Sequence, residues 1–466
     1  MPTLISGVQL SLRALLAQSQ AVEITEHNVA NASTPGYRRQ APILTASAPL
    51  QAYGADRGLQ AGVSGTGVMM NGIQRFSLSF YDTRYRDSVA AWKQSSAESE
   101  GLAEVERILS ETATYGIPSL LDAFWGDWQS LAADPTNLSL RSQLLSDSNN
   151  LTTGLHDRAV DLMNYRSEIN DSLSGKVQQI NDMATQVAAL NAQIARYQNV
   201  DEQPNDFLDS RDRLLDQLAE ISGAVSFIQP DGQASVSIGG HVLVAASESQ
   251  QLQINPDPAN LSLSLITWPD GQALNPQQGE LRGLLQVRDT TIPQQLAALD
   301  DLAAGLATQV NAIHQNGFGM DGLNNRPFFT GNSALALNVN PALTASMIGA
   351  ASAANQPANG TIADQLAQLR EAKTMNGGLE TFNAFNIRQA ADLGRQVQSA
   401  QGYSARNQQS AEMVDLQRES LGGVSLDEEA ANLVRYQKAY QAAARLMTTY
   451  DEMLDQVINR MGLVGR

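Results

Sequence analysis

The 466-residue sequence predicts a mainly α-helical protein with a β-rich insertion, organised as nested, discontinuous domains. Apolar residues recur every seven positions near both ends of the chain and through a long proline-free stretch in its middle. This spacing is typical of long helices that pack against one another. Strand-like runs separated by turns are clear only between residues 223 and 278. The predicted architecture is therefore a terminal α-helical coiled coil, a long-helix bundle and a small β domain.

The first predicted helix runs from about residue 4 to residue 31. Its apolar stripe consists of Val8, Leu12, Leu15, Val22 and Val29. The intervening line is weaker, since Ser11, Gln18 and Thr25 stand where a strong coiled coil has leucine. Pro35 and Gly36 then end the helix, because proline cannot continue it and glycine tolerates a turn. We expect the apolar stripe to be a seam for assembly.

The region that follows is expected to be extended at first and then helical. Residues 38–79 are rich in glycine, which indicates short strands or an irregular segment, and helical patterns dominate from about residue 81 to residue 222. No proline occurs between Pro135 and Pro204. The apolar stripe in this stretch has a seven-residue period that shifts once by four residues: Leu155, Leu162, Ile169, Leu173, Ile180, Val187 and Ile194. Such a stutter unwinds a supercoil locally without ending the helix, so one long helix is predicted.

The β-rich insertion is predicted from apolar runs with turns between them. The runs cover residues 224–228, 234–238, 242–245 and 261–268. The tripeptide Pro-Asp-Gly occurs twice between these runs, and it is a common turn sequence. Helices are expected to return over about 279–315, 362–373 and 379–421.

The last segment carries the strongest periodic signal in the chain. Its seven-residue stripe is formed by Leu426, Leu433, Tyr440, Met447, Leu454 and Met461, with Ile458 on the intervening line. Ser425 and Glu428 form a capping box at its start, with Glu428 reaching back to the cap. Helices at opposite ends that each need a partner suggest that the two ends pair. The expected domains are 1–37 with 424–466 (coiled coil), 38–222 with 279–423 (helix bundle) and 223–278 (β domain).

Composition excludes several classes of function. The chain has 30 Lys and Arg against 48 Asp and Glu, a net charge of −18, which argues against a nucleic-acid partner. It has no cysteine, so a disulfide scaffold and thiol chemistry are excluded. No run of eighteen apolar residues predicts insertion into a membrane. The first twelve residues carry no Lys or Arg, so we expect either a cytoplasmic protein or export without a cleavable signal.

No constellation of residues predicts catalysis, a metal site or a cofactor. The four histidines are far apart in the sequence: His27, His156, His241 and His314. One short helix gathers charged residues at helical spacing, namely Asp209, Arg211, Asp212, Arg213 and Asp216. Carboxylates beside arginines at this spacing are more often a salt-bridged surface than an acid–base pair, and we expect such a surface here.

Two segments at opposite ends resemble a known family. The run from Asn28 to Arg38 resembles the N-terminal motif of bacterial flagellar axial proteins, which build the rod, hook and hook-associated parts. The residues that carry this likeness are Asn28, Asn31, Ser33, Thr34, Pro35, Gly36 and Tyr37. The segment 425–442 resembles the closing helix of the same family. In the middle, 208–215 (LDSRDRLL) and 279–285 (GELRGLL) resemble the hook-associated protein 1 family.

This resemblance implies a structural role without catalysis. Members of that family form a homo-oligomeric ring on the hook protein and join it to the filament through hook-associated protein 3. Their terminal helices line an inner tube, and they leave the cell unfolded through the flagellar type III apparatus. A cytosolic flagellar export chaperone is expected to hold the C-terminal helix, and the mature protein is expected in the extracellular flagellum. Pro35 and Gly36 would turn the chain out of the inner helix, and Tyr37 would pack the turn.

Two other interpretations remain open. The chain could be another flagellar axial protein, such as a hook or distal-rod subunit, although the helical middle disfavours this. It could also be a secreted adhesin or interaction protein with coiled-coil ends. Localisation at the tip of the hook, or hooks without filaments when the protein is lost, would separate these classes.

Overall fold

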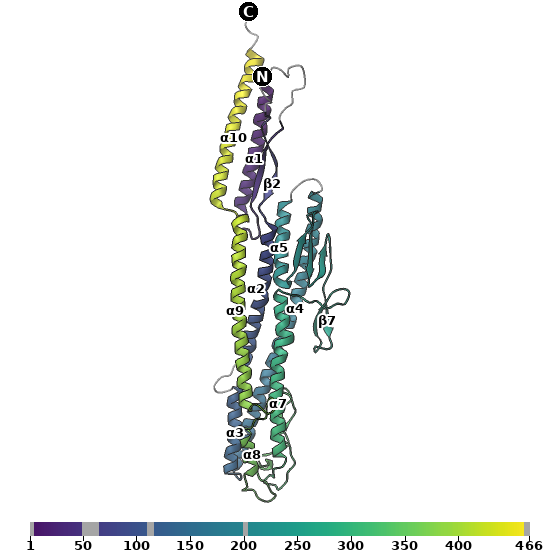
Figure 1. The fold of residues 1–466 in the computed structure, drawn as a ribbon, viewed down its shortest axis with the longest axis vertical. Coiled ribbons are helices and arrows are strands. Elements are labelled where there is room, and N and C mark those ends of the chain that lie inside the picture. Colours follow the sequence, from purple (N-terminus) through teal and green to yellow (C-terminus); the bar gives the residue numbers. More distant parts are fainter. Residues whose placement is uncertain (1–3, 49–64, 110–115, 199–203, 461–466) are drawn as a thin grey trace, which may run out of the picture.

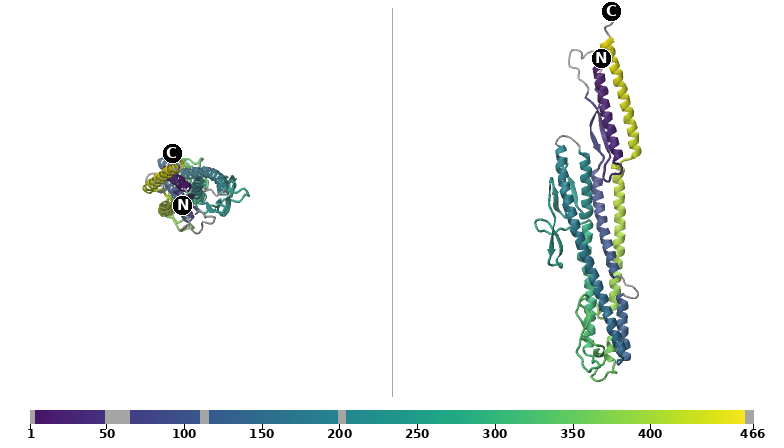
Figure 2. Two further views of the ribbon diagram at one scale, coloured as in Figure 1. Left: turned by 90° about the horizontal axis from the view of Figure 1, so that it is seen from above. Right: turned by 180° about the vertical axis from the view of Figure 1, so that it is seen from behind.

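The computed structural model describes residues 4–48, 65–109, 116–198 and 204–460. The molecule is a long, narrow assembly of helices with the first and last helices at the same end (Figure 1). Seen along its length it is compact in cross-section, with the small sheets on one side (Figure 2). None of the described helices has an apolar stretch long enough to cross a membrane.

We use the name terminal hairpin for the first and last helices and the β ribbon beside them. Helix α1 (Leu4–Ala30) lies antiparallel along α10 (Leu426–Asp455), which continues into a short π-helical turn (Gln456–Arg460). The strands β1 (Gln40–Ala46) and β2 (Val68–Arg75) pair antiparallel and pack on α1. The two ends of the chain therefore meet in one structural unit.

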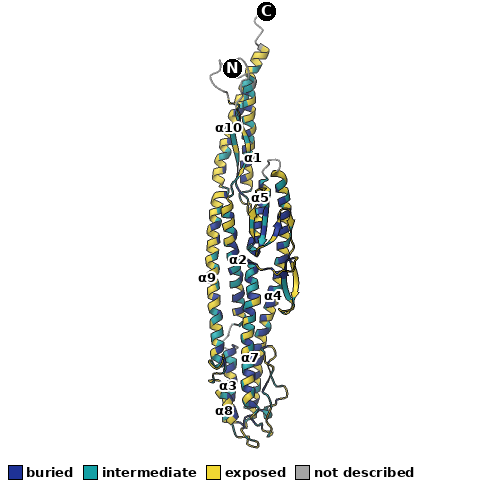
Figure 3. Ribbon diagram, turned by 45° about the vertical axis from the view of Figure 1, so that its right-hand side comes forward, coloured by how far each residue is buried: buried dark blue, intermediate teal, exposed yellow. Residues whose placement is uncertain are grey.

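The rest of the chain forms the body. Its helices are α2 (Ser79–Leu109), α3 (Ile117–Ala133), α4 (Leu138–Gln198), α5 (Asn205–Ser222), α6 (Glu280–Gln286), α7 (Ile292–His314), α8 (Thr361–Gln368) and α9 (Phe382–Gly422). Helices α2 and α9 pack along each other and connect the terminal hairpin to the far end of the molecule (Figure 1). Buried residues line the inner faces of the bundle, whereas the outer side of α9 is exposed (Figure 3).

Helix α4 confirms the predicted long helix. It runs for 61 residues without a break, and all seven residues of the predicted stripe are buried, on both sides of the stutter between Ile169 and Leu173. The stripe packs first against α3 and further along against α5 and the sheets. The change of partner along the helix gives a physical reason for the shift in phase.

The helix predicted over 279–315 contains an irregular turn. Between α6 and α7 the backbone forms a π-helical turn at Val287–Thr291, just before Pro293 in the first turn of α7. Proline has no N–H to donate, and an insertion of this kind lets a helix continue past it.

The predicted β insertion is present as a four-stranded antiparallel sheet and a separate hairpin. The sheet has the order β3 (Val225–Ile228), β4 (Ala234–Ile238), β5 (His241–Ala245) and β6 (Glu248–Ser249), and the hairpin pairs β7 (Gln253–Asp257) with β8 (Leu263–Thr267). Asn191 of α4 holds the sheet in place, because its buried amide donates to the carbonyls of Ala234 and Ala246 and accepts from the Ala234 N–H. The strand β7 was not predicted, since Pro256 within it argues against a strand.

The far end of the body has an aromatic core. Trp128 of α3 packs with Phe328, and Trp125 of the same helix packs with Phe382. The short strands β9 (Phe329–Thr330) and β10 (Asn338–Val339) pair antiparallel in this region. His314 is buried beside Trp128, donates from Nδ1 to the Arg326 carbonyl and accepts at Nε2 from the Gly349 N–H. These two bonds require a neutral imidazole, and burial lowers the pKa of His314 to about 4.

Candidate assembly site

Three segments of the chain cross where the terminal hairpin meets the body. We call this place the joint; it contains residues 28–40, 76–78 and 422–429. The Arg39 N–H donates to the Gly422 carbonyl at 2.8 Å, and the Phe76 N–H donates to the Arg39 carbonyl at 2.9 Å. A Cβ atom at Gly422 would lie 2.7 Å from the Phe76 carbonyl oxygen, so only glycine fits at this crossing. The joint thus fixes how α9 continues into α10.

Asn28 links both ends of the chain at the joint. Its amide nitrogen donates to the Gln40 carbonyl at 2.7 Å and to Glu429 Oε2 at 3.0 Å. Its amide oxygen accepts from the Gln40 N–H at 3.0 Å and from the Tyr37 hydroxyl at 2.8 Å. Every donor and acceptor pairing expected of a buried asparagine is formed, because Glu429 reaches it from α10. The sequence motif therefore depends on a residue about 400 positions away.

The second half of the motif forms a turn. The Thr34 N–H donates to the Asn31 carbonyl at 2.9 Å, and the Thr34 hydroxyl donates to the Asn31 side chain at 3.2 Å. Gly36 has φ +81°, a conformation that favours glycine. The Tyr37 hydroxyl lies 3.0 Å from His27 Nδ1, and burial together with nearby Asp209 raises the pKa of Tyr37 above its ordinary value. Ser33, Thr34, Pro35 and Gly36 themselves are exposed.

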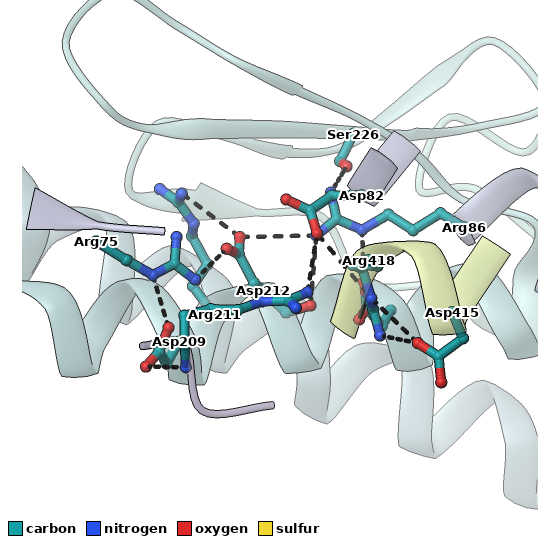
Figure 4. A network of polar contacts seen from close by, with 11 residues as sticks. Arg75, Asp82, Arg86, Asp209, Arg211, Asp212, Ser226, Asp415 and Arg418 are labelled. Atoms are coloured by element: carbon teal, nitrogen blue, oxygen red, sulfur yellow. Dashed lines mark hydrogen bonds and ion pairs between the residues drawn. The ribbon is translucent and has the colours of Figure 1, made fainter. Parts of the chain in front are cut away.

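A network of arginine–aspartate pairs surrounds the joint (Figure 4). From the hairpin side, Arg75 of β2 binds Asp209 at 2.6 Å and Asp212 at 2.7 Å. Within the body, the other pairs are Arg86–Asp216, Arg86–Asp212, Arg211–Asp212, Arg418–Asp216, Arg418–Asp415 and Arg418–Asp82. Arg38, the last residue of the motif segment, binds Asp82 at 3.0 Å and donates its backbone N–H to Asp209. Cations of the hairpin thus bind carboxylates of α2 and α5.

The network corrects the expectation of a salt-bridged surface on α5. The side chains of Asp209, Arg211 and Asp212 are 10%, 3% and 14% exposed, so they are largely buried. Their partners come from β2 and α2 as well as from α5 itself, and a sequence pattern on one helix does not contain these partners. Arg213 is not part of the described ion pairs and lies against Gly36.

The charges around Asp212 keep it ionised. Burial alone raises the pKa of a carboxyl group, but Arg75, Arg86 and Arg211 outweigh this and hold the pKa of Asp212 below its ordinary value. For Asp209, burial dominates and its pKa is raised, although Arg75 opposes the shift. Asp209 also lines a small cleft with His27 and Tyr37. The arrangement as a whole forms a buried electrostatic contact between the hairpin and the body.

The line of contact between α1 and α10 differs from the predicted stripes. A Cβ atom at Gly7 would lie 2.5 Å from the ring of Tyr450, and Asn28 binds Glu429. Both pairs have residue numbers that add up to 457, which defines an antiparallel register. Seven-residue steps on each helix then place Ala14 beside Ala443 and Ala21 beside Tyr436. The helices therefore meet along small residues of α1.

Two of the three polar residues on this line are accommodated by their own helix, whereas the buried amide oxygen of Gln18 has no hydrogen-bond partner among the described residues. The hydroxyl of Ser11 donates to the Gly7 carbonyl at 3.0 Å, and that of Thr25 donates to the Ala21 carbonyl at 2.9 Å. Both side chains are buried, and burial leaves neither hydroxyl donor unpaired. Ser11 and Thr25 interrupt a leucine seam in the sequence pattern, but in the structure they lie on the contact line.

The predicted N-terminal stripe lies beside this contact line. Val8, Leu15 and Val22 are half-buried, and Leu12 and Val29 are 45% and 42% exposed. The face of α1 toward the β ribbon is made of other residues, including Leu10, Ala17 and Ile24. Within the subunit, the predicted stripe is thus a flank of the hairpin rather than its inner seam.

The predicted C-terminal stripe is placed in the same way. Leu433, Met447 and Leu454 are half-buried, Leu426 and Tyr440 are largely exposed, and Ile458 is 72% exposed. Met461 lies outside the described residues. The buried positions of α10 are Glu429, Tyr436 and Ala443, seven residues apart and three after the predicted positions. In the sequence, the contact line of α10 is marked by Tyr436, Ala443 and Tyr450, which recur every seven residues after Glu429.

The capping prediction for α10 is confirmed in one part and wrong in the other. The Ser425 hydroxyl accepts from the Glu428 N–H, as an N-cap does. The Glu428 carboxylate, however, binds Arg39 at 2.9 Å instead of reaching back to the cap.

Among the described residues, no group of three or more His, Asp or Glu side chains could hold a metal ion.

Comparison with known proteins identifies the parts of the chain separately. The family model for the helical domain of the flagellar hook-associated protein FlgK matches residues 102–329. The model for flagella basal body rod proteins matches 9–38, and that for the C-terminal part of flagellar basal body rod FlgEFG proteins matches 422–461. The two terminal matches cover α1 and α10, which the structure brings together.

Whole-length relatives agree with these matches. The chain is 29% identical to "Flagellar hook-associated protein 1" of Bacillus subtilis over 99% of both chains, and 25% identical to the protein of the same name of Escherichia coli over 97% of this chain and 99% of that one. The alignment with the Escherichia coli protein spans 554 positions, more than this chain has residues, so that relative carries segments missing here. This agrees with the compact size of the β insertion.

The fold is also similar to a solved structure. "The structure of the flagellar hook junction protein FlgK from Burkholderia pseudomallei" superposes with a TM-score of 0.69 at 17% identity, over 74% of this chain and 100% of that one. This likeness concerns the fold alone. Taken with the terminal and central family matches and the alignments over the whole length, the chain belongs to the flagellar hook-associated protein 1 family.

Proposed function

We propose that this chain is a structural subunit of the bacterial flagellum that joins the hook to the filament and performs no catalysis. The observation that carries the proposal is the arrangement of its matched parts. The ends resemble rod proteins, the middle resembles the hook-associated helical domain, and the fold unites both ends in one hairpin at the tip of the molecule. Rod proteins and this chain have similar terminal segments and different central segments. The terminal segments are therefore suited to the task that these proteins have in common, which is assembly.

The surface of the hairpin supports assembly with other subunits. Its inner contact line consists of small residues of α1, so the large apolar side chains beside that line remain available. Leu12 and Val29 of the α1 stripe are 45% and 42% exposed, and Leu426 and Tyr440 of the α10 stripe are 56% and 43% exposed. Apolar residues exposed in such numbers along one unit indicate an interaction surface. We propose that the predicted stripes of α1 and α10 contact neighbouring subunits in a homo-oligomeric ring.

The proposal includes the partners of that ring. The hook protein would lie on one side and hook-associated protein 3 on the other. Before assembly the exposed apolar residues of α10 would promote aggregation, which is the physical reason to expect a cytosolic export chaperone on this helix. Export through the flagellar type III apparatus requires an unfolded chain, and a chain without cysteine forms no disulfide on either side of the membrane.

Complementation in the natural host tests the proposal. Deletion of the chromosomal copy should give cells with hooks but without filaments, and this chain supplied from a plasmid should restore attached filaments and swimming. Normal filaments in the deletion strain would contradict the proposal. A hook or distal-rod subunit would instead be required for the hook itself, so loss of hooks would favour that alternative. An adhesin would leave both hooks and filaments intact.

A further inference from the structure

The terminal hairpin carries opposite charges on its two outer sides. On α1, Glu23 and Glu26 are exposed, and on α10, Arg435, Lys438 and Arg445 are exposed. Among the described residues no ion pair joins Glu23, Glu26, Lys438 or Arg445 to another side chain. In a chain with net charge −18, the three cations of α10 form a distinct basic stretch.

The acidic side chains lie on the side of α1 away from α10, and Glu23 also borders a cleft lined by Met70 and Ile73 of β2. Gly7, Ala21 and Asn28 face α10, and Leu10, Ala17 and Ile24 lie toward the β ribbon. The remaining face of α1 carries Leu12, Leu16, Glu23 and Glu26, spaced by three or four residues or multiples of a turn. Such spacing keeps residues on one side of a helix. The outer face of α1 is thus apolar toward its start and acidic toward the joint.

The basic side chains of α10 lie on the side of that helix away from α1. Tyr436 and Ala443 face α1, and Lys438 and Arg445 each follow one of them by two positions. Two positions correspond to a rotation of about 200° around an α-helix, so these cations lie on the outer side of α10. A subunit therefore presents an acidic face and a basic face that cannot touch each other.

The two faces match in height along the hairpin. In the antiparallel register set by the Gly7–Tyr450 and Asn28–Glu429 contacts, Glu23 lies level with Val434. Arg435 is therefore displaced from Glu23 by about 1.5 Å along the axis and Lys438 by about 6 Å, at 1.5 Å per residue. A neighbour at nearly the same height would bring the acidic residues of α1 level with the cations of α10.

We propose that the outer face of α1 in one subunit binds the outer face of α10 in a second copy of the same chain. The contact joins two different surfaces, so it repeats around a ring or helix instead of closing into a pair. Glu23 and Glu26 meet Lys438 of that copy. This inference rests on the proposed function, and it specifies which surfaces of the hairpin the subunits use.

Cysteine cross-linking tests the contact, because the natural chain has no cysteine. Glu23→Cys and Lys438→Cys in one chain should give a ladder of covalent multimers when assembled flagella are treated with a thiol cross-linker about 8 Å long. A matched control pairs Glu23→Cys with Arg406→Cys, an exposed cation of α9, and should remain monomeric. Absence of the ladder, or a cross-link to a different flagellar protein in its place, would overturn the proposal.

Charge reversal separates this contact from the function of the protein. Glu23→Lys and Lys438→Glu should each reduce the fraction of hooks that carry filaments at least threefold, with the circular dichroism and melting temperature of the purified variants unchanged. The combined variant should recover at least half of that loss. If the natural chain restores filaments but neither reversal lowers their number, or the combination shows no recovery, the proposed contact is wrong and the junction function stands. If the natural chain itself fails to restore filaments, the proposed function falls first.

Discussion

Two adjacent glutamates of α10 allow a sharp test of how the joint holds the hairpin. Glu429 is 2% exposed and accepts from Arg39 Nε at 2.8 Å and from Asn28 at 3.0 Å. Glu428 has a side chain that is 63% exposed and binds the same arginine at 2.9 Å. The substitutions Glu429→Gln and Glu428→Gln remove one charge each and keep the shape, so burial is the main difference between them.

The two substitutions should change the equilibrium for local opening of α10 to extents that differ by an order of magnitude. Breaking a buried ion pair from one side costs about 3–5 kcal/mol. Arg39 keeps Glu428 as a partner after Glu429→Gln, so we expect the lower part of that range or slightly less, about 2–3 kcal/mol. An exposed ion pair contributes only about 0.2–1 kcal/mol. At 1.4 kcal/mol per factor of ten, local opening should rise roughly 30–150-fold for Glu429→Gln and less than about fivefold for Glu428→Gln.

Hydrogen exchange at the joint end of α10 measures this opening. Backbone amides in the first three turns of α10 should exchange faster by those factors in the two variants, while amides of α4 keep their natural rates as an internal control. Equal exchange in the two variants would refute the reasoning, because the buried pair would then stabilise the hairpin no more than the exposed one.

Three further predictions follow from the fold. Leu433→Lys should abolish filament attachment in cells and leave the circular dichroism of the helical body unchanged; normal swimming would refute a role for this stripe. Because the pKa of His314 falls from 6.5 unfolded to about 4 folded, stability present above pH 6.5 should be lost as the pH drops toward 4, by up to roughly 3 kcal/mol; urea unfolding at pH 7 and 4.5 measures this, and His314→Gln should flatten the slope. Burial and Asp147 raise the pKa of Asp127 to about 7, so stability should fall as the pH rises from about 4 to above 7. Since Asp127 is only partly buried, Asp127→Asn should recover only about 1–2 kcal/mol at pH 8 and nothing at pH 4.

The long helices could be predicted because their apolar stripes face large partners. In α4 the period, the phase shift and the burial of all seven stripe residues agree, since a 61-residue helix between other helices must bury one continuous side. The β insertion was predictable for a similar reason, because its turns recur as Pro-Asp-Gly. Local pattern and tertiary packing coincide in both regions.

The contact line of the hairpin could not be predicted from apolar periodicity. Gly7 and Ala21 allow α1 to approach α10 closely, and a search for large apolar residues passes over such small ones. The hydroxyls of Ser11 and Thr25 are satisfied by their own helix, so they pack there without the cost that their polarity suggests. The large apolar residues beside this line give the stronger periodic signal, and their role in assembly stays a prediction.

The ion-pair network could not be predicted because its partners are distant in sequence. Asp212 meets Arg75 and Arg86, more than a hundred residues earlier in the chain. The charged pattern on α5 alone fits an exposed helix equally well, and only the fold decides that it is buried. The link from Asn28 to Glu429 spans nearly the whole chain, and the sequence contained both residues within motifs without indicating their contact.

Cryo-electron microscopy of the hook–filament junction tests the central claim most directly. The specimen would be flagella from cells in which this chain is the sole hook-associated protein 1. We expect density for this fold between the hook and the filament, with the terminal hairpins of neighbouring subunits in contact and the body forming the surrounding wall. Density for this chain elsewhere in the flagellum, or a junction formed without it, would show that the chain is not the junction subunit.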